Sequence, residues 1–267
     1  MTEYSPLKAK RLFLFDLDGT LYLGDNLFPG ARELLAFIRT RGGQYRFLTN
    51  NSSRSVDAYV QKLSRLGIAA QPRDFLTSVD AMAAHLHAHG METRRFYVCG
   101  TESMKSQLRA AGFTVAERRE DADALLMGFD TELTFQKLED ACILLGQSAD
   151  YLATNPDWVC PTAYGFVPDC GSVCEMLWHA TGRRPLVIGK PEPAMPLLAM
   201  QQAGASAQET LLIGDRIYTD IASGANAGID TLLVLSGEAK EEDLLTAQPQ
   251  PTFVLPDVQA LLRTLET

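Results

Sequence analysis

The stretch Leu12–Gly24 reads LFLFDLDGTLYLG. Four apolar residues, Leu12–Phe15, lead directly into Asp16, and Asp18 follows after one leucine. An apolar run of this length is typical of a strand buried on both faces of a parallel sheet. Side chains alternate along an extended strand, so we expect Asp16 and Asp18 to point to the same side. Two carboxylates about 4 Å apart repel by about 4 kcal/mol at an effective dielectric constant of about 20, so a proton or a cation must compensate them.

Further short apolar runs end in polar residues or glycine, and segments with helical spacing separate them. This alternation predicts βαβ units and a doubly wound, Rossmann-like α/β core with a parallel sheet. The carboxyl ends of parallel strands meet at one edge of such a sheet, which is where ligands bind. The runs are Tyr45–Leu48 before Thr49 and Asn50, Leu186–Ile188 before Lys190, Leu211–Ile213 before Asp215, Thr231–Leu235, and the weaker Thr252–Leu255.

A separate segment interrupts this series of strand ends. The polar strand ends stop at Asn51 and resume only at Lys190, and the chain between them has strands and helices of its own. We therefore predict an α/β domain of residues 81–182, inserted into a core made of residues 1–80 and 183–267. Its expected strands are 96–99 and 124–127, and its expected helices are 102–111, 134–145 and 172–180.

Composition excludes several classes of partner. Of the 267 residues 46% are hydrophobic, which is enough to build a core, and 33 acidic against 24 basic side chains give a net charge of -9. Such a charge argues against a nucleic acid polymer as partner. We see neither a transmembrane run nor the apolar segment of a signal peptide in MTEYSPLKAKR, so we expect no membrane partner. The odd count of five cysteines fits a reducing compartment, and we expect a cytoplasmic protein.

The residues at the predicted sheet edge suggest a chemistry. Carboxylates at Asp16 and Asp18 are hard oxygen ligands of the kind that Mg²⁺ prefers, and Asp215 and Asp220 supply further carboxylates. Lys190, together with Thr49 and the helix start that follows it, makes an anion site. A cation, an anion site and spare carboxylates together indicate phosphoryl transfer.

Four ordered motifs resemble those of the haloacid dehalogenase (HAD) superfamily, and the resemblance is closest to its NagD-like, or 4-nitrophenylphosphatase-like, branch. It extends over nearly the whole chain, because ATNPD at residues 153–157 and ATGR at 180–183 also match the branch. Several motifs in order are far more specific than any one alone. The motifs are Asp16-x-Asp18-Gly19-Thr20, Thr49-Asn50-Asn51, Gly189-Lys190-Pro191, and Gly214-Asp215-Arg216-x-x-Thr219-Asp220.

The resemblance implies a role for each motif residue, within a HAD-type core that carries a type II α/β cap. Asp16 is implied as the nucleophile that forms an aspartyl-phosphate, and Asp18 as the acid that protonates the leaving alcohol and then activates water. The metal ligands implied for Mg²⁺ are the Asp16 carboxylate, the Asp18 backbone carbonyl and Asp215. The residues implied to hold the phosphoryl oxygens or to position the shell around them are Thr49, Asn50, Lys190 and Asp220.

One loop of the predicted cap is a candidate for substrate specificity. Residues 167–171 align with the loop that lies over the substrate in this branch, which makes Asp169, Cys170 and Gly171 candidate specificity residues. An acidic Asp169 would disfavour substrates with a second anionic group, or accept hydrogen bonds from sugar hydroxyls. Cys170 and Cys174 share the spacing of a zinc pair, but the match to this loop favours packing or substrate contact.

The expected activity is that of a phosphoric monoester hydrolase. By resemblance it is a Mg²⁺-dependent phosphatase of small phosphorylated metabolites, such as nucleoside monophosphates or sugar phosphates, with 4-nitrophenyl phosphate as an artificial substrate. Two alternatives stay open: a phosphotransferase that uses the same aspartyl-phosphate, and a non-catalytic phosphate-binding or receiver-like protein. A homodimer formed through the cap is the oligomer we consider. The motifs do not select one physiological substrate.

Overall fold

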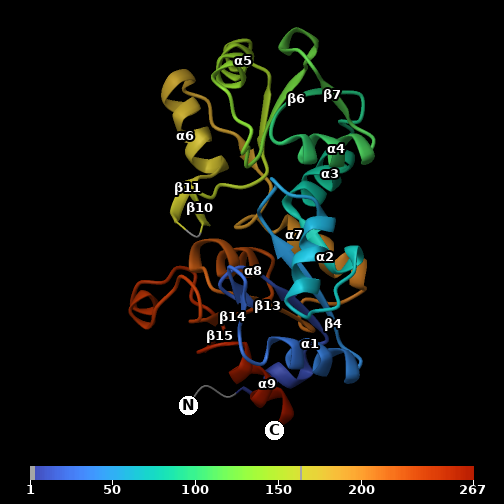
Figure 1. The fold of residues 1–267 in the computed structure, drawn as a ribbon, viewed down its shortest axis with the longest axis vertical. Helices are drawn as coiled ribbons and strands as arrows, with labels where there is room; N and C mark the ends of the chain where they lie inside the picture. The colour runs from blue at the N-terminus through green and yellow to red at the C-terminus, as the bar shows by residue number, and fades with distance from the viewer. Residues whose placement is uncertain (1–3, 163) are drawn as a thin grey trace. The chain divides into compact units, whose positions relative to one another are not determined.

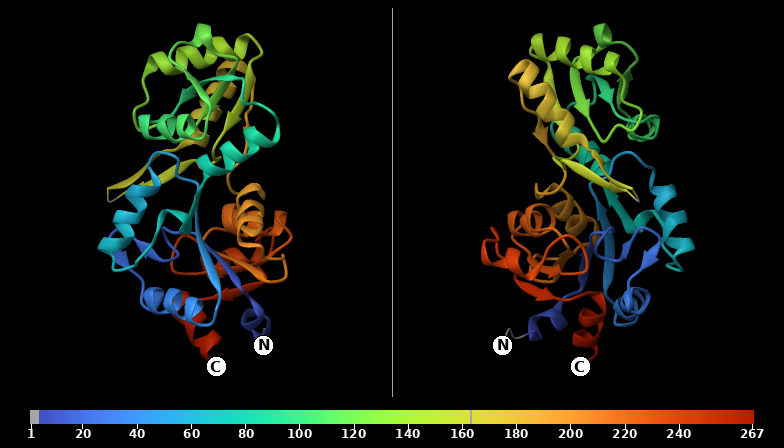
Figure 2. Two further views of the ribbon diagram at one scale, coloured as in Figure 1. Left: turned by 90° about the vertical axis from the view of Figure 1, so that its right-hand side faces the viewer. Right: turned by 60° about the vertical axis from the view of Figure 1, so that its left-hand side comes forward.

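The computed structural model describes residues 4–162 and 164–267 (Figure 1). The chain forms two compact units, coloured along the chain in Figure 2. Unit 1 comprises Met1–Thr49, Val60–Leu76 and Lys190–Thr267, and unit 2 comprises Asn50–Tyr59 and Thr77–Gly189. The domain boundaries expected from the sequence, 80/81 and 182/183, stay a prediction, and the compact units divide the chain at other residues.

Unit 1 is built on a six-stranded sheet in the order β15-β14-β13-β1-β4-β5. β1 pairs in parallel with β13 on one side and β4 on the other, and β14 and β15 continue the sheet in parallel beyond β13. The parallel sheet and its crossover helices confirm the predicted α/β class. The strands are β1 Leu12–Phe15, β4 Gln44–Thr49, β5 Phe75–Thr77, β13 Thr210–Gly214, β14 Asp230–Val234 and β15 Phe253–Leu255.

Amphipathic helices pack against this sheet. α1 turns Leu34, Leu35 and Ile38 inward, at the spacing of one helical face, and it contacts α9, while α7 contacts β1 and β4. The helices of unit 1 are α1 Ala31–Thr40, α7 Ala194–Ala203, α8 Ala222–Asn226 and α9 Val258–Glu266. Helix α2, Val56–Arg65, begins in unit 2 and continues into unit 1 from Val60. The shorter elements are η1 Ser5–Ala9, the hairpin β2 Tyr22–Leu23 and β3 Asn26–Leu27, η2 Pro72–Asp74, the π-helical turn η4 Ile217–Ile221, and η5 Glu241–Leu245.

Unit 2 has its own five-stranded parallel sheet, in the order β12-β9-β8-β6-β7. The strands and helices expected between 96 and 180 are present, with ends that differ by up to two residues. The strands are β6 Arg95–Cys99, β7 Thr114–Ala116, β8 Ala124–Met127, β9 Asp150–Ala153 and β12 Leu186–Val187, with the antiparallel hairpin β10 Val159–Thr162 and β11 Gly165–Pro168. The helices are α3 Ser78–Ala88, α4 Glu102–Ala110, α5 Phe135–Gly146 and α6 Cys170–Thr181, with the short η3 Arg119–Asp121.

The expected strand Leu186–Ile188 does not belong to the core sheet, so its place in the sequence-based reading was wrong. As β12 it pairs with Leu152 and Ala153 of β9, in the sheet of unit 2. It is a short edge strand, and Leu186 is 55% exposed. Its apolar residues therefore do not mark a strand that is buried on both faces. A short apolar run predicts a strand, but not the sheet that the strand joins.

The central position of β1 places the polar strand ends close together. All four of its side chains are buried. Its last residue, Phe15, is in register with Ile213 of β13 and Phe47 of β4. Asp16, Asp215 and Thr49 lie one or two residues beyond these partners, so all three lie at the carboxyl edge of the sheet.

Within the part of the chain that the structure describes, no helix combines the length and the apolar character needed to cross a membrane.

Candidate active site

A buried lysine joins two of the predicted carboxylates at the sheet edge of unit 1. Lys190 Nζ lies 2.6 Å from Asp16 Oδ1 and 2.6 Å from Asp220 Oδ1, and it donates to the Leu48 carbonyl at 3.4 Å. The Lys190 side chain is 3% exposed. Burial of a charge at this depth is costly unless the charge is paired, and here two carboxylates from different chain segments pair it.

A third carboxylate completes an acidic cluster. Oxygens of Asp16, Asp215 and Asp220 all lie within 4.8 Å of one another. Asp215 Oδ2 accepts a hydrogen bond from the Glu238 backbone N–H at 2.8 Å, whereas its buried Oδ1 has no hydrogen-bond partner among the described residues. A buried carboxylate oxygen without a donor is costly, and a divalent cation would satisfy it. This donor set therefore fits a hard metal ion.

Two glycines allow the backbone to approach Asp215 closely. A Cβ atom at Gly19, whose φ is +85°, or at Gly237 would collide with the Asp215 carboxylate. Ser236 Oγ donates to the Gly19 carbonyl at 2.8 Å, which fastens the loop after β14 to the loop after β1. Position 19 thus requires glycine for two reasons: a side chain would collide with Asp215, and the backbone has a positive φ.

The cluster carries more negative than positive charge, and its pKa values reflect this. Burial raises the pKa of Asp16 well above its ordinary value, and Asp220 and Asp215 add to the rise, although Lys190 opposes it. Burial, and then Asp220, raise the pKa of Asp215 to about 6. Burial by itself would lower the pKa of Lys190, but Asp16 and Asp220 raise it overall. One ammonium, at Lys190, does not balance three carboxylates, so the cluster has a net negative charge that an added cation would neutralise.

The side chain of Asp18 is not one of the three in this cluster. β1 ends at Phe15, so strict alternation does not continue to Asp18, and its carboxylate is 48% exposed. Tyr22 Oη donates to Asp18 Oδ2 at 3.3 Å, and Lys62 Nζ lies 3.5 Å from Asp18 Oδ1. The expected role of the Asp18 carbonyl as a metal ligand stays a prediction.

Thr49 and Asn50 differ in their surroundings. Thr49 is the last residue of β4 and is 7% exposed, at the same sheet edge as Asp16. Asn50 belongs to unit 2, where its Nδ2 donates to Asp157 Oδ2 at 2.8 Å. The Asn50 side chain thus has a structural contact in unit 2 that the sequence did not predict, and its expected role as a phosphate ligand stays a prediction.

Asp169, the expected specificity residue, has a structural task within unit 2. It is the N-cap of α6, where it accepts from the Cys170 backbone N–H, and Asn155 Nδ2 donates both to Asp169 Oδ1 and to Asp157 Oδ2. Asp169 is 5% exposed and Cys170 is fully buried. A Cβ atom at Gly171 would collide with the backbone of residue 156. The specificity role of Asp169, Cys170 and Gly171 stays a prediction.

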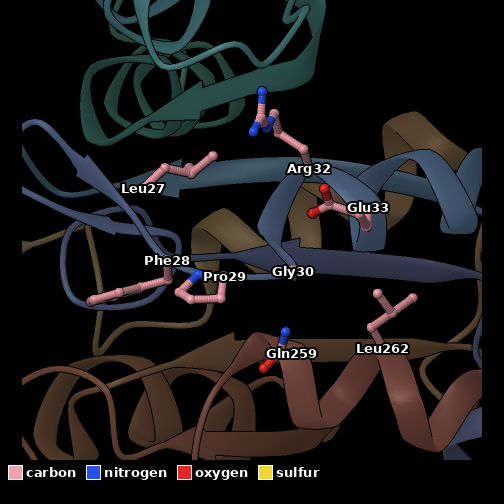
Figure 3. A pocket seen from close by; sticks show the side chains of 8 residues that line it. All are labelled: Leu27, Phe28, Pro29, Gly30, Arg32, Glu33, Gln259 and Leu262. Atoms are coloured by element: carbon pink, nitrogen blue, oxygen red, sulfur yellow. The ribbon is translucent and has the colours of Figure 1, made fainter.

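Each unit also has a pocket of its own. A pocket of about 760 Å³ in unit 2 is lined by Asp169, together with Arg54, Phe129 and Tyr164. A pocket of about 400 Å³ in unit 1 is lined by none of the predicted site residues. Figure 3 shows it between the segment 27–33 and side chains of α9.

Sequence reasoning missed side chains that contact the predicted residues. They include Tyr22 and Lys62 beside Asp18, and Asn155 and Asp157 beside Asp169 and Asn50. The match of residues 153–157 to the branch was the available signal for the second pair. No short-range pattern connects Lys62 with Asp18, because their contact depends on how α2 packs.

The chain is similar to known proteins over nearly its whole length. A family profile described as haloacid dehalogenase-like hydrolase matches residues 13–114, and a HAD-hydrolase-like profile matches residues 187–261. The chain is 35% identical to the 5'-nucleotidase YutF of Bacillus subtilis, over 93% of this chain and 96% of that protein.

Solved structures are similar over the same length. The 4-nitrophenylphosphatase of Thermotoga maritima superposes with a TM-score of 0.93 at 37% identity, covering 97% of this chain and 99% of that one. The glycerol phosphate phosphatase of Mycobacterium tuberculosis in complex with magnesium gives a TM-score of 0.90 at 33% identity, covering 98% of this chain and 78% of that one.

Proposed function

Because this chain belongs to the haloacid dehalogenase-like hydrolases, in their NagD-like branch, we propose that it is a Mg²⁺-dependent phosphatase of small phosphorylated metabolites. The observation that carries this proposal is the buried Lys190 between Asp16 and Asp220, in a cluster with Asp215, one of whose oxygens has no hydrogen-bond donor among the described residues. Relatives named for nucleotides and for glycerol phosphate support phosphomonoesters as the substrate class.

Mg²⁺ would be held by the carboxylates of Asp16 and Asp215 and by the Asp18 carbonyl, with Asp220 positioning the shell. When bound, the metal would supply positive charge that neutralises the phosphoryl oxygens and so reduces their repulsion of the Asp16 carboxylate. Lys190 is already paired with Asp16, so its ammonium is close to the oxygens that would surround phosphorus. Thr49, followed in the chain by Asn50, would bind the same phosphoryl group.

The reaction then takes two displacements at phosphorus. In the first, an Asp16 oxygen attacks phosphorus, the bond to the alcohol oxygen breaks, and Asp18 gives its proton to that oxygen. The products of this step are the free alcohol and an aspartyl-phosphate at Asp16. In the second, Asp18 takes a proton from water, the hydroxide attacks phosphorus, and the bond to Asp16 breaks. Inorganic phosphate leaves, and Asp16 is regenerated.

The test is phosphate release from 4-nitrophenyl phosphate with and without Mg²⁺. We expect turnover only with the metal, and we expect Asp16→Asn to lower kcat by about 10³-fold or more, since an amide is a poor nucleophile. Asp25→Asn is the control, because Asp25 is an exposed acid of the same unit. Full turnover by Asp16→Asn would refute the proposal.

A further inference from the structure

We propose that Lys62 and Tyr22 are positioning residues for the Asp18 carboxylate, an inference that rests on the proposed function. Each carboxylate oxygen has a different partner. The Tyr22 hydroxyl donates to Oδ2 at 3.3 Å, and the Lys62 ammonium lies 3.5 Å from Oδ1. All three residues belong to unit 1. The two partners contact the carboxylate through different oxygens and so restrict its rotation.

Lys62 and Tyr22 also contact each other. The Lys62 ammonium lies 3.9 Å from the centroid of the Tyr22 ring, a cation–π geometry, and its side chain is only 15% exposed. Tyr22 is fully buried. Tyr22 contacts both of the other side chains: its hydroxyl donates to Asp18, and its ring lies against the Lys62 ammonium. The three side chains form a closed set of mutual contacts.

The backbone fixes the same turn. The Gly19 N–H donates to the Tyr22 carbonyl at 2.8 Å, and Asp18 and Tyr22 form an isolated β-bridge. The side chain of Asp18, in contrast, is 48% exposed, and an exposed aspartate is free to change rotamer unless its neighbours hold it. The backbone thus places the Cα of Asp18, while Tyr22 and Lys62 place its oxygens.

This placement matters because Asp18 must reach two atoms in turn, the leaving oxygen and then the attacking water. A general acid or base works only within hydrogen-bond reach, and a displacement of about 1 Å costs about 100-fold in rate. An ion pair with a half-exposed carboxylate contributes little to folding stability. Removal of Lys62 should therefore affect catalysis much more than folding.

Two substrates with different leaving groups test the inference. The 4-nitrophenolate ion leaves without a proton, whereas the alcohol of an alkyl phosphate needs one from Asp18. The measurements are kcat for glycerol phosphate or a sugar phosphate, whichever the wild type hydrolyses faster, and the rapid-mixing rate of the first turnover of 4-nitrophenyl phosphate.

For Lys62→Met we expect kcat for the alkyl phosphate to fall by about 10- to 100-fold, while the first turnover of 4-nitrophenyl phosphate stays within about threefold of wild type. Steady-state turnover of 4-nitrophenyl phosphate should slow, because Asp18 also activates water, so a burst of nitrophenolate should precede it. Lys62→Arg keeps the cation and should restore alkyl phosphate turnover. Tyr22→Phe keeps the ring but loses the hydroxyl, and should give a smaller loss of the same kind.

Arg65→Met is the matched control, because Arg65 is an exposed cation near the end of the same helix, and we expect both rates to stay at the wild-type level. The inference is overturned if Lys62→Met leaves alkyl phosphate turnover unchanged, or if it lowers the first turnover of 4-nitrophenyl phosphate as much as the alkyl rate. Failure of the proposed function looks different, since the wild type itself would then release no phosphate from either substrate.

Discussion

Asp215 is the residue at which binding and stability oppose each other. The residue is 2% exposed, its carboxylate lies close to those of Asp16 and Asp220, and one of its oxygens has no donor among the described residues. In the metal-free protein this arrangement is unfavourable, because like charges repel and the buried oxygen is unsatisfied. We infer that a bound cation offsets this cost.

Replacement of Asp215 by asparagine should separate these two effects. We expect Asp215→Asn to leave the free energy of unfolding of the metal-free protein unchanged or higher, since a buried charge is removed. The wild type should gain about 2.7 kcal/mol at a Mg²⁺ concentration about 100 times Kd, and the variant should gain almost nothing. Thermal unfolding with and without Mg²⁺ measures both. An equal gain in wild type and variant would remove Asp215 from the metal site, and Asp25→Asn is again the control.

Single residues also mark the limit of sequence-based prediction. Asp16 and Asp215 could be named from strand ends alone, because parallel strands bring their carboxyl ends to one edge. The same reasoning does not account for Lys190, because the run before it, Leu186–Ile188, belongs to the sheet of unit 2. The partners of Asp18 could not be named in this way. Lys62 reaches Asp18 through the packing of a helix that begins far along the chain, and local spacing does not encode that distance.

Among the elements, helix α6 combines a structural and a proposed functional role in one residue. Asp169 caps its first turn and also lines the pocket of unit 2. Alanine at this position would remove the cap and the charge together, at a cost of about 1 kcal/mol in stability. Serine keeps a capping oxygen but removes the charge and the carboxylate that accepts from Asn155, so comparison with alanine separates the loss of the charge from the loss of the cap.

For Asp169→Ser we expect near wild-type stability, together with a change in substrate preference. Loss of the negative charge should raise kcat/KM for phosphates with a second anionic group by about fivefold relative to neutral sugar phosphates, which corresponds to about 1 kcal/mol between unit charges about 4 Å apart in water. A panel of nucleotides and sugar phosphates measures the ranking. If the ranking is the same in wild type, Asp169→Ala and Asp169→Ser, Asp169 is only a helix cap.

Elements also show why strand prediction was only partly correct. The run Leu12–Phe15 is buried on both faces, and its apolar pattern identified a central core strand. The run Leu186–Ile188 has a similar composition, but its strand lies at the edge of the other sheet. Hydrophobic pattern reports burial within a few residues, whereas sheet membership depends on contacts between segments far apart in sequence.

At the scale of the whole molecule, the acidic cluster and its lysine belong to one unit. Asp16, Lys190, Asp215 and Asp220 all lie in unit 1, although the chain passes through unit 2 before it reaches the last three. The sequence indicated this division through the gap between its second and third motifs. It could not set the exact boundaries, because residues 50–59 join unit 2 through contacts such as that of Asn50 with Asp157.

This distribution predicts where Mg²⁺ should slow hydrogen exchange. Ligand binding stabilises the cooperative unit that holds the ligand, and exchange reports stability region by region. We expect slower exchange in peptides that cover residues 12–22 and 210–221 of unit 1, and unchanged exchange in β6 and β8 of unit 2. Asp215→Asn should abolish the effect. Equal protection of both units would mean that they open together, and the cation would then stabilise the chain as a single cooperative structure.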